Sequence, residues 1–361
     1  MKLALTLMVR DEADVISAML DHHLAQGVDV IIVTDNGSSD GTTEILREYE
    51  QRGQLELRID PLHQKQQGRL VTQMARDAAT RYGADWVINA DADEFWVPVA
   101  AGVTLHEAFE HIPQSVRTFD VTVNDMIGAP AWSGSGLQRL GYRDLRDDAE
   151  LKRIGLRSHA THDAPHIGTD DIVVAQGNHF VNLAKGDPVP DGWNVEVLHF
   201  PWRSWEQYGR KVRNTGTSYE NSPDLVPSPN HHGMRDYRRL KAGILLPMYV
   251  CRHPSPSELE DGLRTGAFVA DDRIATTRSS PVADAPMDET EIERERGLGL
   301  AVAELDGRLK DQDDEIRRLQ EQHAADQSEL EGLRELVEAY RNRSIVRLSD
   351  RVSRTLKGTR D

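Results

Sequence analysis

The stretch Trp86-Val87-Ile88-Asn89-Ala90-Asp91-Ala92-Asp93-Glu94-Phe95-Trp96 is a short apolar run that ends abruptly in three carboxylates. Such a run is typical of a buried strand in a parallel sheet, and ligands gather beyond the carboxyl end of such strands. Because side chains alternate along an extended chain, Asp91 and Asp93 point to the same side. Two such carboxylates repel each other unless a cation separates them, and Mn²⁺ or Mg²⁺ prefers oxygen ligands. The stretch therefore predicts a strand end with a divalent-metal site, and a helix N-terminus with capping acids is the alternative.

The chain before this stretch alternates between strand and helix patterns. Apolar or β-branched runs predict strands at 3–9, 28–34 and 55–59, and amphipathic patterns predict helices at 15–24, around Ile45 and at 69–82. Strands that alternate with helices at short intervals predict an α/β fold with a mostly parallel sheet and flanking helices.

The loops after three of these strands carry polar residues. The carboxyl ends of parallel strands meet at one edge, so Arg10, Asp35 and the Asp91/Asp93 pair should converge in one cleft. Asp35 can accept hydrogen bonds from a base or ribose, and Ser38 lies near a helix N-terminus, where anions are favoured. A turn followed by an N-cap is the alternative for residues 35–41. The glycine patterns of a P-loop and of a dinucleotide-binding fold are missing, so we expect a metal and scattered polar groups to hold a nucleotide here.

Three ordered motifs resemble the GT-A glycosyltransferases, and among them the family-2-like group. They are Arg10-Asp11-Glu12 after the first strand, Asp35-Asn36-Gly37-Ser38 after the second, and Asp91-Ala92-Asp93-Glu94-Phe95. The resemblance covers about residues 1–215 in pieces. It implies a GT-A fold and a metal-dependent enzyme that moves a sugar, with inversion, from a nucleotide-diphosphate donor to an acceptor hydroxyl. The acceptor would be a glycan, a lipid-linked molecule or another hydroxyl compound.

The resemblance also implies roles for single residues. The nucleotide sugar would be bound by Arg10, Glu12, Asp35, Asn36, Ser38, Arg69, Asp91, Arg203 and Lys211. His199 would be the third metal ligand beside Asp91 and Asp93, with a place in an aromatic cluster beside Trp202 as the alternative. No motif places the general base, for which the candidates are Asp163, Asp170, Asp171 and Glu196.

The middle of the chain is less regular. Residues 176–181 and 195–200 predict two further strands, and we interpret His179, in the first of them, as a core or supporting residue. The histidines and aspartates of residues 159–171 fit no zinc motif and indicate a solvated loop. Residues 231–235 suggest an acceptor-side loop.

The C-terminal part follows a heptad pattern. One register contains Leu298, Leu305, Gln312, Leu319, Asp326, Leu333 and Tyr340, and the other contains Val302, Leu309, Ile316, His323, Leu330 and Val337. The pattern favours a parallel two-stranded coiled coil and therefore a homodimer, with a single helix lying on the catalytic domain as the alternative. The predicted domains are 1–270 (GT-A), 271–290 (linker), 291–340 (coiled coil) and 341–361 (basic amphipathic tail).

Composition restricts the partners and the compartment. Acids outnumber bases by 60 to 43, which argues against a nucleic-acid partner. The single Cys251 suits a reducing compartment, and the N-terminus fits no signal peptide. We therefore expect a cytoplasmic protein whose basic tail contacts the inner face of a membrane, with a solvated, disordered tail as the alternative.

Two other functions compete with glycosyl transfer. A nucleotidyltransferase also uses paired acids on an α/β sheet, but it would usually show a glycine- and arginine-rich phosphate loop, which is missing after Val9. A non-catalytic scaffold, assembled through the coiled coil, would bind sugar nucleotide without turnover. The presence of Asp35, Asp91 and Asp93 together argues against a scaffold.

Overall fold

The computed structural model describes residues 1–62, 67–156, 158–222, 226–227, 231–275 and 282–357. The chain divides into two compact units, Met1–Ala303 and Glu304–Asp361. We describe each unit by itself.

A central sheet of the first unit has the order β3-β2-β1-β4-β9. Its strands are β1 (Leu3–Val9), β2 (Val30–Asp35), β3 (Glu56–Ile59), β4 (Trp86–Ala90) and β9 (His166–Ile167). The first four strands are parallel and β9 is antiparallel to β4. The predicted α/β fold with a mostly parallel sheet is therefore confirmed.

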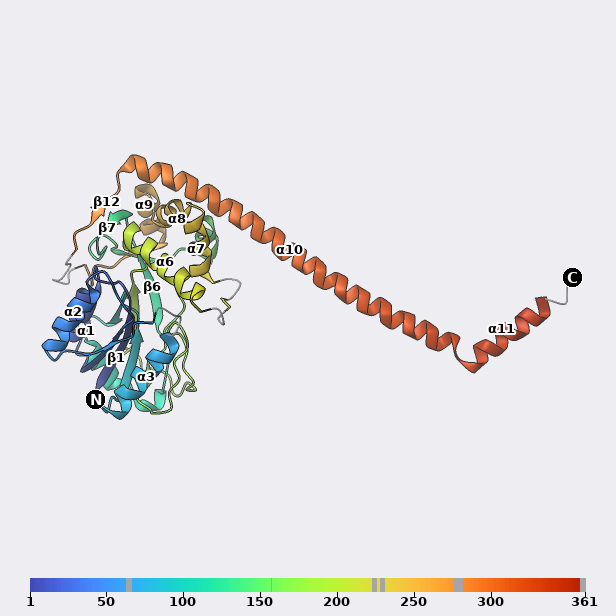
Figure 1. Cartoon of the computed structure of the whole chain (residues 1–361), viewed down its shortest axis with the longest axis horizontal. Coiled ribbons are helices and arrows are strands. Elements are labelled where there is room, and N and C mark those ends of the chain that lie inside the picture. Colours follow the sequence, from blue (N-terminus) through green and yellow to red (C-terminus); the bar gives the residue numbers. More distant parts are fainter. Residues whose placement is uncertain (63–66, 157, 223–225, 228–230, 276–281, 358–361) are drawn as a thin grey trace. The chain divides into compact units, whose positions relative to one another are not determined.

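Helices cover both faces of this sheet (Figure 1). They are α1 (Ile16–Ala25) and α2 (Thr42–Gln51) on one face and α3 (Gln67–Thr80) on the other. Within β1, Leu5 belongs to the core on the α1 side, whereas Ala4 packs with Met74 of α3. This burial on both faces explains why the strands read as continuous apolar runs.

A second sheet has the order β11-β8-β6-β10-β5. Its strands are β5 (Glu94–Pro98), β6 (Thr122–Ile127), β8 (Tyr142–Asp144), β10 (Val195–His199) and β11 (Phe268–Ala270). Residues 91–93 join β4 to β5, so the acidic motif lies where the two sheets meet. The remaining elements of this region are α4 (Leu105–His111), η1 (Gln114–Val116), β7 (Ala131–Ser133) and α5 (Asp148–Arg153).

The strand predicted at 195–200 is confirmed, but the one predicted at 176–181 is wrong. This segment forms turns, with a single bridge between Val174 and Val181. Gly177 and Asn178 have φ angles of 87° and 65°, in the left-handed region. Consecutive left-handed residues cannot continue an extended strand.

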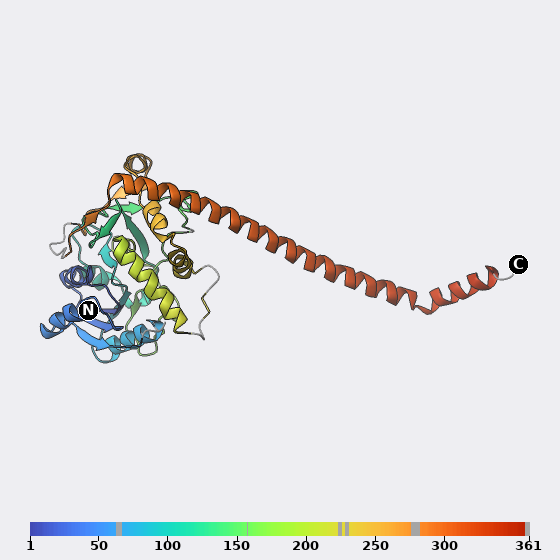
Figure 2. The ribbon, with the colours of Figure 1, turned by 45° about the horizontal axis from the view of Figure 1, so that its top comes forward.

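Between β10 and β11 the structure describes the helices α6 (Trp205–Glu220), α7 (His232–Lys241), α8 (Leu245–Arg252) and α9 (Pro256–Thr265). Helix α6 begins at the predicted cap, where Ser204 accepts a hydrogen bond from the backbone N–H of Gln207. It packs beside α7 (Figure 2, yellow-green), because Gly216 leaves room for the ring of Tyr237. The loop predicted at 231–235 is wrong, since His231 caps α7 and the helix starts at His232.

Helix α10 (Glu289–Arg341) begins on the first unit. A Cβ at Gly299 would lie 2.2 Å from the carbonyl oxygen of Pro247, so glycine allows the close approach. Just before α10, the strand β12 (Ala285–Pro286) pairs with β7, and Asp284 forms an ion pair with Arg139. Part of the predicted linker 271–290 (residues 276–281) lies outside the described residues. The rest includes this packed segment, and the unit boundary falls after Ala303 instead of at residue 290.

The second unit consists of the remainder of α10 and of α11 (Ser344–Lys357). Beyond Ala303, the apolar heptad residues of α10 are half exposed or more, namely Leu305, Leu309, Ile316, Leu319, Leu330, Leu333, Val337 and Tyr340. No helix in the described parts of the chain has the length and apolarity that crossing a membrane would require.

Candidate functional site

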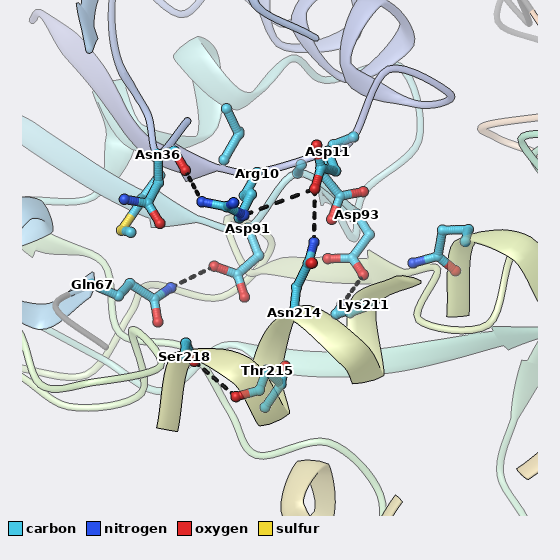
Figure 3. Close-up of a pocket in the computed structure, with 15 residues that line it drawn as sticks. Arg10, Asp11, Asn36, Gln67, Asp91, Asp93, Lys211, Asn214, Thr215 and Ser218 are labelled. Carbon is cyan, nitrogen blue, oxygen red and sulfur yellow. Dashed lines mark hydrogen bonds and ion pairs between the residues drawn. The ribbon is translucent and has the colours of Figure 1, made fainter. Parts of the chain in front are cut away.

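A cavity of about 180 Å³ lies at the carboxyl edge of the central sheet (Figure 3). It is lined by Met8, Val9, Arg10, Asp11, Glu12, Asn36, Gln67, Asp91, Ala92, Asp93, Gln207, Lys211, Asn214, Thr215 and Ser218. The ends of β1, β2 and β4 supply the first of these residues, and α6 supplies the last five. The convergence expected from the strand pattern therefore occurs for Arg10 and the Asp91/Asp93 pair, together with Glu12 and Asn36.

Asp91 and Asp93 have different partners within the cavity. Oδ1 of Asp91 accepts hydrogen bonds from Nε2 of Gln67 at 2.8 Å and from Nδ2 of Asn178 at 3.2 Å. Burial and the charge of Asp93 raise the pKa of Asp91. Burial alone would also raise the pKa of Asp93, but the Lys211 ammonium and the His199 imidazole hold it well below its ordinary value. Asp91 is therefore the less compensated of the two charges.

Three cationic groups face a single oxygen of Asp93. Nζ of Lys211 lies 2.5 Å from Oδ2, Nη1 of Arg203 lies 3.6 Å away, and Nε2 of His199 lies 3.7 Å away. The other ring nitrogen of His199, Nδ1, donates to Oδ1 of Asp125 at 2.7 Å. Burial would lower the pKa of His199, but Asp93 and Asp125 raise it well above its ordinary value. The predicted third metal ligand therefore lies beside the acidic pair, with its Nδ1 held by Asp125 and its Nε2 facing Asp93.

The acidic pair can be tested against the donor set that Mn²⁺ or Mg²⁺ needs. Among the described residues no three His, Cys, Asp or Glu side chains are placed to hold a metal ion. Magnesium sites, however, usually use one or two carboxylates and complete their shell with water and substrate phosphate oxygens. Asp91 and Asp93 at one strand end, with the pKa of Asp91 raised, fit this kind of site. They do not form an all-protein cage.

Asp35 lies outside the cavity lining and is buried. Its Oδ1 accepts hydrogen bonds from the backbone N–H of Ser38 at 3.0 Å and from its hydroxyl at 2.7 Å, and Thr43 donates to Oδ2. Aspartate commonly stabilises turns in this way. Asp35 and Ser38 therefore stabilise the turn that carries Asn36. This agrees with the alternative interpretation of residues 35–41 as a turn.

Two predicted phosphate-binding arginines also lie outside the lining. Arg203 is fully buried, and its guanidinium donates to Asp14 at 2.7 Å and to Glu12 at 2.5 Å. It positions Glu12, whose pKa burial raises to about 7 although Arg203 opposes the shift. Arg69 is exposed on α3. Arg203 thus contacts the lining residues Glu12 and Asp93 from behind the cavity, whereas Arg69 lies on the surface of α3.

The candidates for the general base occupy different surroundings. Asp170 and Asp171 are exposed in a turn. Glu196 accepts both guanidinium N–H groups of Arg143 at 2.9 Å and a further hydrogen bond from Arg273 at 2.8 Å, which indicates a structural role. Asp163 is fully buried and hydrogen-bonded to His179.

Several lining residues were not predicted from the sequence. Asp11 has a φ of 57° and accepts hydrogen bonds from Ser39 and from Asn214 at 2.8 Å. Helix α6 contributes Gln207, Asn214 and Ser218 besides the predicted Lys211, and these four residues are spaced four, three and four residues apart. This spacing defines one helix face, so the polar periodicity of residues 207–218 was the signal that could have identified them.

The fold and site together define an α/β protein with an acidic strand-end motif in a cavity. Residues 6–124, about a third of the chain, match the model of glycosyltransferase family 92. The chain is thus similar to glycosyltransferases over the part that carries the three motifs, whereas the expected family-2-like subgroup is not confirmed. No curated protein matches the chain.

Solved structures with a similar fold include two complexes of S. aureus TarS residues 1–349. The complex with UDP has 13% identity and a TM-score of 0.32, and the alignment covers 84% of this chain and 92% of that one. The complex with UDP-GlcNAc has 12% identity and a TM-score of 0.33, with 73% and 76% covered. Glucosyl-3-phosphoglycerate synthase from Mycobacterium tuberculosis with Mn²⁺, UDP-glucose and phosphoglyceric acid has 14% identity and a TM-score of 0.25, with 46% and 56% covered. Similarity at this level does not bear on the site.

Proposed function

We propose that the protein is a metal-dependent glycosyltransferase that moves a sugar from a nucleoside-diphosphate donor to an acceptor hydroxyl, with inversion at the anomeric carbon. One observation carries the proposal: Asp91 and Asp93 share a cavity at the strand end with the ammonium group of Lys211. The match of residues 6–124 to a glycosyltransferase family supports it.

The lining suggests how a donor would be bound. The diphosphate would lie between Lys211 and Arg10, which contribute positive charge to the cavity. Asn36, from the turn after β2, and Gln67, from α3, would meet the nucleoside, and the hydroxyls of Thr215 and Ser218 offer hydrogen bonds from α6. Asp91 and Asp93 would hold Mn²⁺ or Mg²⁺, which supplies charge neutralisation for the departing diphosphate.

Donor binding would change the surroundings of Asp93. Lys211 now occupies its Oδ2, and the lysine side chain is 38% exposed, so it has room to move. A diphosphate offers several anionic oxygens to the Lys211 ammonium. If Lys211 paired with the diphosphate instead of with Asp93, the Asp93 carboxylate would be available to bind the metal. We therefore expect donor and metal to bind cooperatively.

Calorimetry with UDP, GDP, CDP and dTDP, each with and without Mn²⁺, tests the proposal. We expect one diphosphate to bind in a metal-dependent way, and the protein to hydrolyse the corresponding sugar donor slowly. Asp93→Asn should remove the metal-dependent part of the diphosphate affinity. Asp170→Asn changes a residue in an exposed turn and should leave that affinity unchanged.

The alternatives give different results. Binding of the sugar nucleotide without turnover of any donor and acceptor pair would favour the scaffold. Release of pyrophosphate from a nucleoside triphosphate and a sugar phosphate would favour the nucleotidyltransferase. If no diphosphate bound at all, glycosyl transfer would be refuted.

We also propose that the exposed heptad stripe of α10 pairs with a second copy of the chain, and that the basic tail contacts an anionic membrane surface. The half-exposed apolar residues between Leu305 and Tyr340 support the first proposal. Arginines at 347, 351 and 354, together with exposed Leu348 and Val352 on α11, support the second.

A further inference from the structure

We infer that His179, oriented by Asp163, is the general base that takes the proton from the attacking acceptor hydroxyl. The inference rests on the proposed transferase function and names a residue that the function leaves open.

The hydrogen bonds of His179 define its tautomer. Its Nδ1 lies 3.1 Å from the carbonyl oxygen of His162 and 3.3 Å from Oδ1 of Asp163. A carbonyl oxygen and a carboxylate only accept hydrogen bonds, so Nδ1 carries the proton. Nε2 then keeps its lone pair and is available as a base, as in the orienting acid–histidine pairs of other enzymes.

Asp163 is held in an unusual position for a carboxylate. It is fully buried, and its backbone forms two hydrogen bonds with Val121, which fix the main chain. Its second oxygen, Oδ2, has no hydrogen-bond partner among the described residues. A buried carboxylate with an unpaired oxygen is costly, and such groups concentrate at functional sites.

We call His179 and Asp163 the dyad. The turn that precedes His179 connects the dyad to the cavity, because its side chains bond to residues of the cavity lining. Gln176 donates to Oε1 of Gln67 at 2.5 Å, and Asn178 donates to Oδ1 of Asp91 at 3.2 Å. Both acceptors line the cavity. The imidazole folds over Gly177 between them, where a Cβ would lie 3.0 Å from Nε2. The imidazole therefore lies on the same turn whose two other side chains reach the cavity lining.

The backbone at this turn is strained to achieve that placement. Asn178 is buried and adopts a φ of 65°. Non-glycine residues in this region are uncommon and are found disproportionately at functional sites.

His179 is accessible enough to contact an acceptor molecule. Its side chain is 34% exposed and is not part of the donor-cavity lining. Phe180, which is 57% exposed, lies edge-on to His162, with ring centroids 5.2 Å apart. The exposed Phe180 ring gives the rim an apolar surface on which a sugar acceptor can lie.

The charges around His179 favour the imidazolium that proton transfer creates. Burial would lower the pKa of His179, but the hydrogen bond and charge of Asp163, followed by the charge of Asp91, raise it. His162, the neighbouring titratable group, faces Asp120 at 3.3 Å, and Lys185 pairs with the same carboxylate.

The step balances as a direct displacement. The acceptor O–H proton moves to Nε2 while the acceptor oxygen forms a bond to the anomeric carbon of the donor sugar. The bond between that carbon and the diphosphate oxygen breaks, and its electron pair leaves with the diphosphate. Asp163 stabilises the resulting imidazolium, as a positioning residue.

The test compares His179→Gln, Asp163→Asn and the matched control His162→Gln, each checked by circular dichroism. Turnover is measured with a panel of UDP-sugars, including UDP-glucose, and UDP affinity is measured with Mn²⁺. We expect His179→Gln to lower kcat by about 10²- to 10⁴-fold, the usual contribution of a general base, with UDP affinity unchanged. His162→Gln should retain wild-type turnover.

The pH profile separates a catalytic role from a structural one. The wild-type profile should lose activity on the acid side as His179 is protonated. This limb should vanish in His179→Gln and move to lower pH in Asp163→Asn, because removal of the carboxylate lowers the pKa of the imidazole. ¹⁵N NMR of the wild-type imidazole should show the Nδ1–H tautomer, and this measurement needs no variant.

Two sets of results would overturn the inference. Full turnover and an intact acid limb in His179→Gln, with normal UDP binding, would remove His179 from catalysis and leave the proposed function standing. An Nε2–H tautomer of His179 in the ¹⁵N NMR spectrum would have the same consequence. A wild-type protein that bound none of UDP, GDP, CDP and dTDP and turned over no sugar donor would overturn the proposed function and this assignment together.

Discussion

The contact between Lys211 and Asp93 leads to a prediction about single residues. Lys211→Met removes the ammonium that lies 2.5 Å from Asp93, so two buried carboxylates lose their nearest compensating charge. A divalent cation should then bind more readily. We expect the affinity of the nucleotide-free protein for Mn²⁺ to rise by about tenfold, and UDP to strengthen Mn²⁺ binding less than in the wild type. Electron paramagnetic resonance of free Mn²⁺ measures both effects.

A second lysine offers a control for that measurement. Lys241 forms an exposed ion pair with Glu220 at 2.7 Å, away from the cavity lining. Lys241→Met should therefore leave Mn²⁺ binding unchanged. Equal Mn²⁺ affinity in Lys211→Met and the wild type would mean that Lys211 does not compete with the metal.

Asp35 leads to a second prediction at this scale. Asp35→Ala removes the acceptor for Ser38 and Thr43, and leaves their groups unpaired in the turn that carries Asn36. We expect a loss of about 1–3 kcal/mol in the free energy of unfolding, together with weaker UDP binding. Urea denaturation and calorimetry provide the two values. Weaker UDP binding at unchanged stability would place Asp35 in direct contact with the nucleotide instead.

At the scale of elements, α1 is joined to the edge strand β5 by two buried histidines. Nε2 of His22 donates a hydrogen bond to the carbonyl oxygen of Trp96 at 2.8 Å. Nε2 of His23 accepts a hydrogen bond from the backbone N–H of Trp96 at 3.3 Å. Burial lowers the pKa of His22 to about 4 and that of His23 to about 3. The helix therefore satisfies backbone groups of a strand that, in the described part of the chain, has no neighbouring strand on this side.

These depressed pKa values predict acid sensitivity. The unfolded chain takes up protons below about pH 6.5 and the folded protein does not, so stability present above that pH is lost as the pH falls. Each histidine should cost about 2 kcal/mol between pH 7 and pH 5. His23→Phe should be less stable than the wild type at pH 7 and show a flatter decline in urea unfolding. The exposed His111 provides the control, since His111→Phe should keep the wild-type slope.

At the scale of the whole molecule, we expect the second unit to determine the oligomeric state. A lone helix has no core for the half-exposed stripe from Leu305 to Tyr340, whereas a partner helix supplies one. We expect full-length protein to be dimeric and residues 1–303 alone to be monomeric by light scattering. The truncation after Ala303 keeps the part of α10 that packs on the first unit. A monomeric full-length protein, or a dimeric truncated one, would exclude the coiled coil.

Much of this architecture could be read from local patterns. The strand runs, the helix periodicity and the acidic motif at residues 91–93 depend on neighbouring residues, and the carboxyl-edge rule then brings Arg10 and Asn36 to the same cavity. These features follow from the sequence by itself because side-chain alternation and burial on both faces are properties of each segment.

The partners of the polar residues were decided only by the tertiary structure. Asp35 pairs with Ser38 and Thr43, and Arg203 pairs with Glu12 and Asp14. Lys211 reaches Asp93 across 118 positions, and Asp163 meets His179 in a turn that the pattern indicated as a strand. A carboxylate or a guanidinium looks the same in the sequence whether it binds a ligand or pairs with a distant segment. Which of these occurs depends on the side chains that folding brings within hydrogen-bonding distance, and local periodicity does not contain that information.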